Sequence, residues 1–280
     1  MPSSSSVQHA RQALGQRLRE VRKHSGLTAR ALAKLAGWHE SKCSRIENGK
    51  TSPSIGDIRT WVHHCGAEQQ VEDLIAAAHG IEGMYLEWQR LCRTGLRQHQ
   101  ENAVPLYEST RRFRVYEPGV VPGLLQTQAY ARALMGAIIA FRQLPDDTDA
   151  AVAARVTRQR VLYEGDHRFA VLLEESVLRT RVGGGDVMSA QLGHLLVLAS
   201  LPQVSLGIIP ASADRVMWPL EGFWIFDETS VQVELATAEV TVTQPSEVAI
   251  YKRTFAALAE MAVYGPAARA RITAAVDALG

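Results

Sequence analysis

The strongest constraint on the fold is a pair of short helical patterns, joined by a glycine turn, within residues 28–50. The first begins at Thr28, a favourable N-cap residue, and Gly37 suits the tight turn that follows it. The second is polar throughout except for Cys43 and Ile46, which lie three residues apart and therefore share one face. Two short helices that each bury one narrow side predict a helix-turn-helix, with the second helix over residues 39–49.

Three more amphipathic segments flank this pair and are expected to complete its core. We expect helices over residues 10–24, from about residue 55 to 61, and over residues 68–79. Together the five helices predict a compact all-helical domain over residues 10–80. The serine run before it predicts a disordered tail at residues 1–9.

Charge divides unevenly between this region and the rest of the chain. Residues 1–80 carry 11 Lys and Arg against 7 Asp and Glu, whereas the remainder carries 19 against 22. A basic small domain joined to a mildly acidic larger one suggests that only the first meets a polyanion.

The pattern changes after the helical region. A longer amphipathic stretch predicts a linking helix over residues 81–104, and residues 105–280 alternate between strand and helix patterns. Strands are expected at 111–118, 168–176 and 204–210 and at three further places between 222 and 243. We therefore predict a mainly α chain whose second domain, residues 105–280, is a mostly helical α+β domain with a small sheet.

The stretch GLTARALAKLAGWHESKCSRIENGKTSPS resembles the Cro/C1-type (XRE-family) helix-turn-helix, with its GLT start, AG turn and SRIENGK-x-x-P end. The similarity covers residues 11–79 and implies a five-helix, lambda-repressor-like domain that binds DNA through helix 39–49. The residues that this resemblance implies as base-reading are His39, Glu40, Ser41, Ser44 and Arg45. Those implied as phosphate-binding are Arg30, Lys34, Lys42, Asn48 and Lys50, and Arg22 with Glu47 would brace the first helix against the third. Where the family usually has Gln after the capping Thr, this chain has Ala29, so Arg30 or Lys34 would have to hold that phosphate.

Two of these side chains favour particular bases. Arg45 can donate two hydrogen bonds to guanine O6 and N7, and Glu40 can accept one from cytosine N4. A half-site containing guanine and cytosine is therefore expected.

The larger domain carries a second resemblance. YEPGVVPGLLQTQAYARAL, MSAQLGHLL, GFWIFD and YKRTFAALA are similar to the C-terminal domain that follows the helix-turn-helix in many actinobacterial regulators. That resemblance covers most of residues 100–265. It implies transcriptional control, often beside a small partner protein encoded nearby, and an antitoxin-like character.

Enzymatic and metal sites find little support in the sequence. Gly183–Gly185 lacks the Lys-Ser/Thr of a phosphate-binding loop, and His39 with Cys43 has a ligand spacing that the core position of Cys43 disfavours. The aromatic residues Trp218, Phe223, Trp224 and Phe226 are expected chiefly as core. The alternative is a ligand pocket or partner surface that includes Tyr116, Trp218 and Trp224. We therefore expect no enzyme activity, no cofactor and no metal.

These patterns predict a cytoplasmic, sequence-specific DNA-binding transcriptional regulator that binds a double-stranded operator as a homodimer. The α+β domain, residues 105–280, is expected to serve dimerisation and the response to a partner or ligand. No apolar run is long enough to span a membrane, and no secretory signal precedes the first helix. Two alternatives stay open. One is an antitoxin-like protein that mainly binds a small partner protein and autoregulates its operon, and the other is a small-molecule receptor.

Overall fold

The structure is a computed structural model that describes residues 4–80 and 85–279. The chain divides into two compact units. The first comprises residues 1–85 with the short segment 241–248, and the second comprises residues 86–240 with 249–280.

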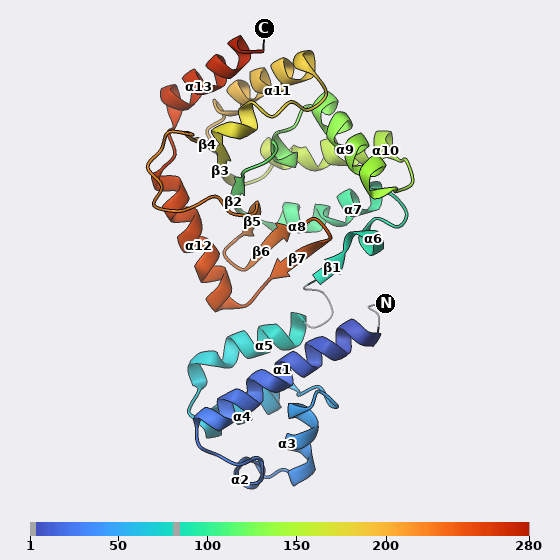
Figure 1. The fold of residues 1–280 in the computed structure, drawn as a ribbon. Helices are drawn as coiled ribbons and strands as arrows, with labels where there is room; N and C mark the ends of the chain where they lie inside the picture. The colour runs from blue at the N-terminus through green and yellow to red at the C-terminus, as the bar shows by residue number, and fades with distance from the viewer. Residues whose placement is uncertain (1–3, 81–84, 280) are drawn as a thin grey trace. The chain divides into compact units, whose positions relative to one another are not determined.

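Within residues 4–80 the first unit contains five α-helices (Figure 1). They are α1 (Ser4–His24), α2 (Ala29–Leu35), α3 (Glu40–Glu47), α4 (Ile55–Cys65) and α5 (Val71–Gly80). Their buried sides form one core that includes Leu18, Leu32, Ile46 and Trp61. The predicted five-helix domain and its helix-turn-helix, α2 and α3, are confirmed.

Two expectations at the edges of this unit are wrong. Residues 4–9, predicted as part of a disordered tail, are the first turns of α1, because the helical pattern that follows them extends back to Ser4. Residues 1–3 of that predicted tail lie outside the described residues.

The predicted linking helix over residues 81–104 is also wrong. Residues 81–84 lie outside the described part of the chain, and the remainder is strand β1 (Tyr85–Glu87) followed by short helices. Gly95 interrupts any helix at this point, because its φ of 106° lies outside the helical range. The Asp147 carboxylate accepts the backbone N–H of Leu96, the next residue, at 2.9 Å. The indole of Trp88 donates to the Leu235 carbonyl at 2.8 Å, so this segment is part of the second unit rather than a linker.

The second unit is built on a sheet of seven strands among the described residues, in the order β1-β7-β6-β5-β2-β3-β4. The strands other than β1 are β2 (Arg112–Glu117), β3 (Arg168–Glu174), β4 (Val204–Ile209), β5 (Phe223–Phe226), β6 (Ser230–Glu234) and β7 (Ala238–Val242). Strands β2, β3 and β4 are parallel neighbours, whereas β5 is antiparallel to β2. The sheet is therefore mixed, and its parallel part requires the helical crossovers that the sequence places between these strands.

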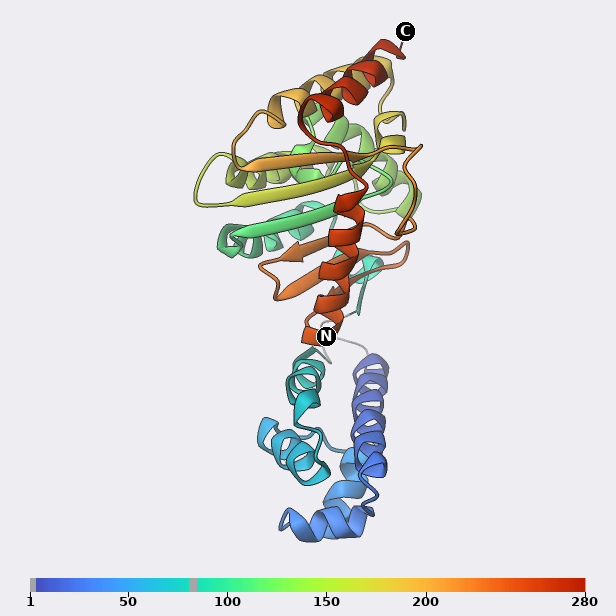
Figure 2. The ribbon, with the colours of Figure 1, turned by 90° about the vertical axis from the view of Figure 1, so that its left-hand side faces the viewer.

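Helices surround this sheet. They are α6 (Trp88–Leu91), α7 (Arg97–Asn102), α8 (Val104–Ser109), α9 (Gln128–Arg142), α10 (Thr148–Arg158), α11 (Gly185–Leu198), α12 (Pro245–Glu260) and α13 (Gly265–Asp277). Helices α7 to α10 lie on one side of the sheet and α12 on the other (Figures 1 and 2). The core joins Phe113, Val171 and Phe226 of the sheet to Leu192 and Leu195 of α11. The predicted fold class, a helical domain followed by an α+β domain, is confirmed.

Candidate nucleic-acid interface

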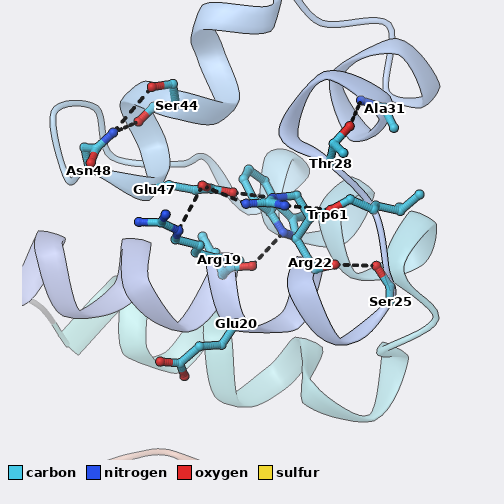
Figure 3. Close-up of polar contacts among 12 residues, drawn as sticks. Arg19, Glu20, Arg22, Ser25, Thr28, Ala31, Ser44, Glu47, Asn48 and Trp61 are labelled. Carbon is cyan, nitrogen blue, oxygen red and sulfur yellow. Dashed lines mark hydrogen bonds and ion pairs between the residues drawn. The ribbon is translucent and has the colours of Figure 1, made fainter.

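The turn between α2 and α3 is closed by local hydrogen bonds. The Thr28 hydroxyl accepts the Ala31 N–H at 3.1 Å and caps α2 (Figure 3). Gly37 has a φ of 68°, the left-handed conformation that a glycine adopts without strain, and the Trp38 N–H then bonds the Ala33 carbonyl at 2.8 Å. The two helices are therefore held at a fixed angle by the residue types that the sequence places at these positions.

Helix α3 buries Cys43 and Ile46 and turns its polar side chains outward. The five residues predicted to read bases, His39, Glu40, Ser41, Ser44 and Arg45, are all exposed. His39 caps the helix, because its Nδ1 accepts the Ser41 N–H at 3.3 Å and lies 2.9 Å from the Ser41 hydroxyl. The Arg45 side chain makes no hydrogen bond or ion pair within the described residues, so its guanidinium is available to an external acceptor.

A buried ion pair fixes α3 on α1. Arg22 donates from Nε to Glu47 Oε1 at 2.5 Å and from Nη2 to Oε2 at 3.0 Å, and its Nη1 bonds the Leu27 carbonyl at 2.6 Å (Figure 3). The two side chains are only 9% and 8% exposed. The hydrogen bond to Glu47 raises the pKa of Arg22, although burial acts in the opposite direction. The geometry is that of the brace that the sequence predicted, and breaking such a pair typically costs about 3–5 kcal/mol.

A glycine lets the same two helices approach closely. A Cβ on Gly15 of α1 would lie 2.4 Å from the Ile46 carbonyl oxygen of α3, so no other residue fits without displacing the backbone. Helix α1 is also tied to α4, because the Trp61 indole donates to the Leu18 carbonyl at 3.0 Å. Sequence reasoning missed Gly15, because a glycine inside a helical pattern signals close approach only when the neighbouring helix is known.

The predicted phosphate-binding residues differ in their availability. Arg30, Lys34, Asn48 and Lys50 are exposed, and Asn48 caps α3 through its side-chain N–H bonded to the Ser44 carbonyl at 2.7 Å. Lys42 is engaged elsewhere: its ammonium lies 2.6 Å from Asp57 Oδ1 and 4.6 Å from the centre of the Trp38 ring. A phosphate contact by Lys42 would compete with this ion pair.

The partner of Lys42 is itself part of a helix cap. Ser54 and Asp57 form a reciprocal capping box at the start of α4, with both hydrogen bonds at 3.1 Å. Burial raises the pKa of Asp57, but the bonds from Lys42 and Ser54 outweigh it, and the pKa is lowered. Lys42 therefore links α3 to the start of α4.

Comparison with known proteins identifies both units. A model described as a helix-turn-helix domain matches residues 13–75, from α1 into α5. A second model, described as a domain of unknown function (DUF5753), matches residues 101–274, which is more than half of the chain. The chain belongs to the DUF5753 family.

Two further comparisons place no similar protein of known function beside this DUF5753 protein at a level that carries an argument. No curated protein matches its sequence. One solved structure that it resembles is that of TrmBL2, an archaeal chromatin protein described as showing a novel mode of DNA binding. The two share 12% identity over 85% of this chain and 88% of that chain, at a TM-score of 0.33, which is too low to support an inference.

The three aromatic residues predicted as a possible ligand or partner surface do not lie together in the DUF5753 domain. Tyr116 is fully buried and its hydroxyl donates to Glu174 at 2.9 Å, whereas Trp218 is 64% exposed. Trp224 pairs with Val115 across β2 and β5, so it lies on the opposite face of the sheet from Tyr116. The alternative of one shared surface is not met by these positions, because side chains of neighbouring strand residues alternate between faces. The expectation that Trp218 is a core residue is wrong, because this side chain is exposed.

Membrane insertion through a helix is not indicated for the described part of this DUF5753 protein. None of its helices combines the length and the apolar character that crossing a bilayer requires.

Proposed function

We propose that this protein is a sequence-specific DNA-binding transcriptional regulator that inserts α3 into the major groove. The observation that supports it most is the division of α3 into two sides. Cys43, Ile46 and Glu47 attach the helix to its own domain, and the exposed side carries Glu40, Ser41, Ser44 and Arg45.

The side chains on that face have the chemistry that base reading requires. A free arginine donates to guanine, a glutamate accepts from cytosine, and a serine hydroxyl does either. Glu40 lies 3.8 Å from Arg30 in an exposed pair, so little stabilisation is lost when it turns to a base instead. Asn48 and Lys50, at and just beyond the end of the same helix, would contact phosphates of the DNA backbone.

The proposal is tested by selecting bound sequences from a pool of random double-stranded DNA with the full chain. We expect enrichment of one motif that contains guanine and cytosine in each half-site. Equal recovery of all sequences, with binding that depends only on salt, would contradict sequence-specific readout and leave a non-specific DNA-binding protein.

We further propose that the protein binds its operator as a homodimer, because an eight-residue recognition helix reaches only a few base pairs. Two half-sites about one helical turn apart, or a multiple of it, would then be selected together. Analytical ultracentrifugation of the complex with the selected DNA should give two chains per duplex. One chain per duplex would overturn this part of the proposal.

The alternative function, an antitoxin-like protein that holds a small partner protein, is favoured by one observation. Val216 and Trp218, in the segment between β4 and β5, are 67% and 64% exposed, and exposed tryptophans are enriched in protein interfaces. Co-expression with the product of the neighbouring gene tests it. Trp218→Ala should then weaken the complex without affecting DNA binding.

A further inference from the structure

A buried arginine of α10 has no bonding partner among residues 4–80 and 85–279. Arg158 is 7% exposed and makes no hydrogen bond or ion pair within the described residues, and its Nε is enclosed without an acceptor. Its guanidinium carbon lies 4.4 Å from the centre of the Tyr107 ring, which supports one face of the group. Buried cations in proteins are normally paired with an anion, so Arg158 lacks the partner that its position requires.

A second arginine lies beside it on the same side of α10. Arg155 donates from Nε to Gln100 at 3.1 Å and from Nη1 to Gln126 at 2.6 Å, and both acceptors are neutral amide oxygens. A methyl group on Gly123 would lie 3.4 Å from Arg155 Cζ and 3.5 Å from Arg158 Nη2, so the two guanidinium groups converge beside that glycine. Burial, together with the charge of Arg158, lowers the pKa of Arg155 to about 10, which leaves it protonated at neutral pH.

The carboxylates nearby compensate these charges incompletely. Glu234 and Glu239 act on the two arginines through space, but within the described residues no carboxylate oxygen lies within 4.0 Å of either guanidinium. Burial, and then the charge of Glu234, raises the pKa of Glu239 to about 7. Part of Glu239 is therefore uncharged at neutral pH, and a positive excess is left around Arg155 and Arg158.

Arg158 also lines a cavity of about 270 Å³ between α8, the end of α10 and the segment before β3. Arg160, His167, Glu108 and Glu164 are among its other lining residues. The two glutamates and Arg160 are exposed, where water and salt screen their charges, whereas the buried charge of Arg158 is screened much less.

We propose that this cavity binds the carboxylate or phosphate group of a small ligand, with Arg158 as its principal charged contact. A guanidinium presents paired N–H groups in one plane, the arrangement that matches two oxygens of such an oxyanion. The volume is at the lower end for ligand pockets, so the ligand is small. The inference concerns the second unit alone and does not depend on DNA binding.

The test is thermal unfolding of the full chain at pH 7 in sodium phosphate, sodium acetate or sodium chloride at matched ionic strength. We expect phosphate or acetate to raise the Tm by several degrees in a saturable manner, and chloride to have no such effect. Which of the two salts acts distinguishes a phosphate ligand from a carboxylate. Titration calorimetry with the active anion then measures the affinity directly.

Variants at two arginines test whether the anion raises the Tm by binding to Arg158. Arg158→Gln should weaken anion binding at least tenfold and, without anion, unfold at the same or a higher temperature, because it removes a buried charge that has no partner in the described part of the chain. The matched control is Arg179→Gln, an exposed arginine paired with Glu175 at 3.6 Å, which should keep the full response. Arg158→Lys keeps the charge but loses the paired donors, so it should also bind at least tenfold more weakly.

Three results would overturn the proposal. The first is a wild-type chain that responds to phosphate and acetate no more than to chloride. The second is an Arg158→Gln variant that binds the anion as well as the wild type does. The third is a failure of both Arg158 variants to fold, or a lower Tm of Arg158→Gln without anion, which would assign Arg158 a purely structural role.

Discussion

At the scale of single residues, Arg45 is the side chain on which the proposed base readout most depends. It is exposed on α3 and unpaired within the described residues, whereas Arg22 and Lys42 are held by carboxylates. Arg45→Ala should reduce the difference in binding free energy between operator and random DNA by about 1–3 kcal/mol, and the ratio of the two affinities falls accordingly. Electrophoretic mobility shifts with both DNAs measure this ratio. Arg132→Ala, which removes an exposed charge from α9, should leave it unchanged, and an unchanged ratio in Arg45→Ala would contradict the assignment.

A second prediction at this scale concerns the titration of Glu117. Burial, and then the charge of Glu234, raises its pKa to about 8, although the hydrogen bond from the Trp224 indole at 2.9 Å opposes this. The folded state therefore binds its proton more tightly than the unfolded state, whose pKa is near 4.5. The stability that this group contributes is complete below about pH 4.5 and is lost as pH rises through 8, by at most about 1.4 kcal/mol per pH unit.

Glu117→Gln removes this titration and keeps an oxygen for the Trp224 indole. The variant should unfold at a higher temperature than the wild type at pH 8 and at a similar temperature at pH 5. Thermal unfolding followed by circular dichroism at the two pH values measures the difference. A variant that is less stable at pH 8 would show that the charged carboxylate is needed there.

At the scale of helices, the crossing of α1 and α3 depends on Gly15, and the same substitution at another glycine provides a control. Gly15→Ala should destabilise the first unit by about 1–3 kcal/mol, because its Cβ overlaps the Ile46 carbonyl. Gly56→Ala, in the first turn of α4, places its Cβ 3.7 Å from the Ser54 hydroxyl and should stabilise by up to about 1 kcal/mol. Urea unfolding of the two variants should shift in opposite directions. A stabilising Gly15→Ala would mean that the helices separate at little cost.

At the scale of the whole molecule, DNA binding should depend strongly on salt, because the first unit carries the basic excess of the chain. Lys50→Ala should weaken binding to operator and random DNA by the same factor and reduce the slope of log affinity against log salt by about one. Fluorescence anisotropy between low and physiological salt measures both quantities. A loss confined to the operator would show that Lys50 reads a base rather than a phosphate.

Much of the first unit could be predicted because its information is local. Thr28 as a cap, Gly37 in the turn and the spacing of Cys43 and Ile46 each act within a few residues, so the helix-turn-helix follows from short-range chemistry. The Arg22–Glu47 pair joins residues far apart in the sequence, and it came from a family resemblance that the geometry then matched. The engagement of Lys42 with Asp57 could not be predicted in this way, because nothing in the sequence of α3 indicates which helix lies beside Lys42.

The second unit depended more on tertiary structure. Its α+β class and its strands could be predicted from the alternation of polar and apolar residues. The continuous helix predicted over residues 81–104 does not form, because Gly95 interrupts it and the Asp147 carboxylate accepts the N–H groups that follow. The sequence by itself determined which segments become helix or strand, because propensity and periodicity are local. Only the packed structure decided that Tyr116 and Trp224 face opposite ways, and that Arg155 and Arg158 converge with no carboxylate of the described residues between them. Burial and electrostatic pairing depend on neighbours that the chain brings together from distant positions.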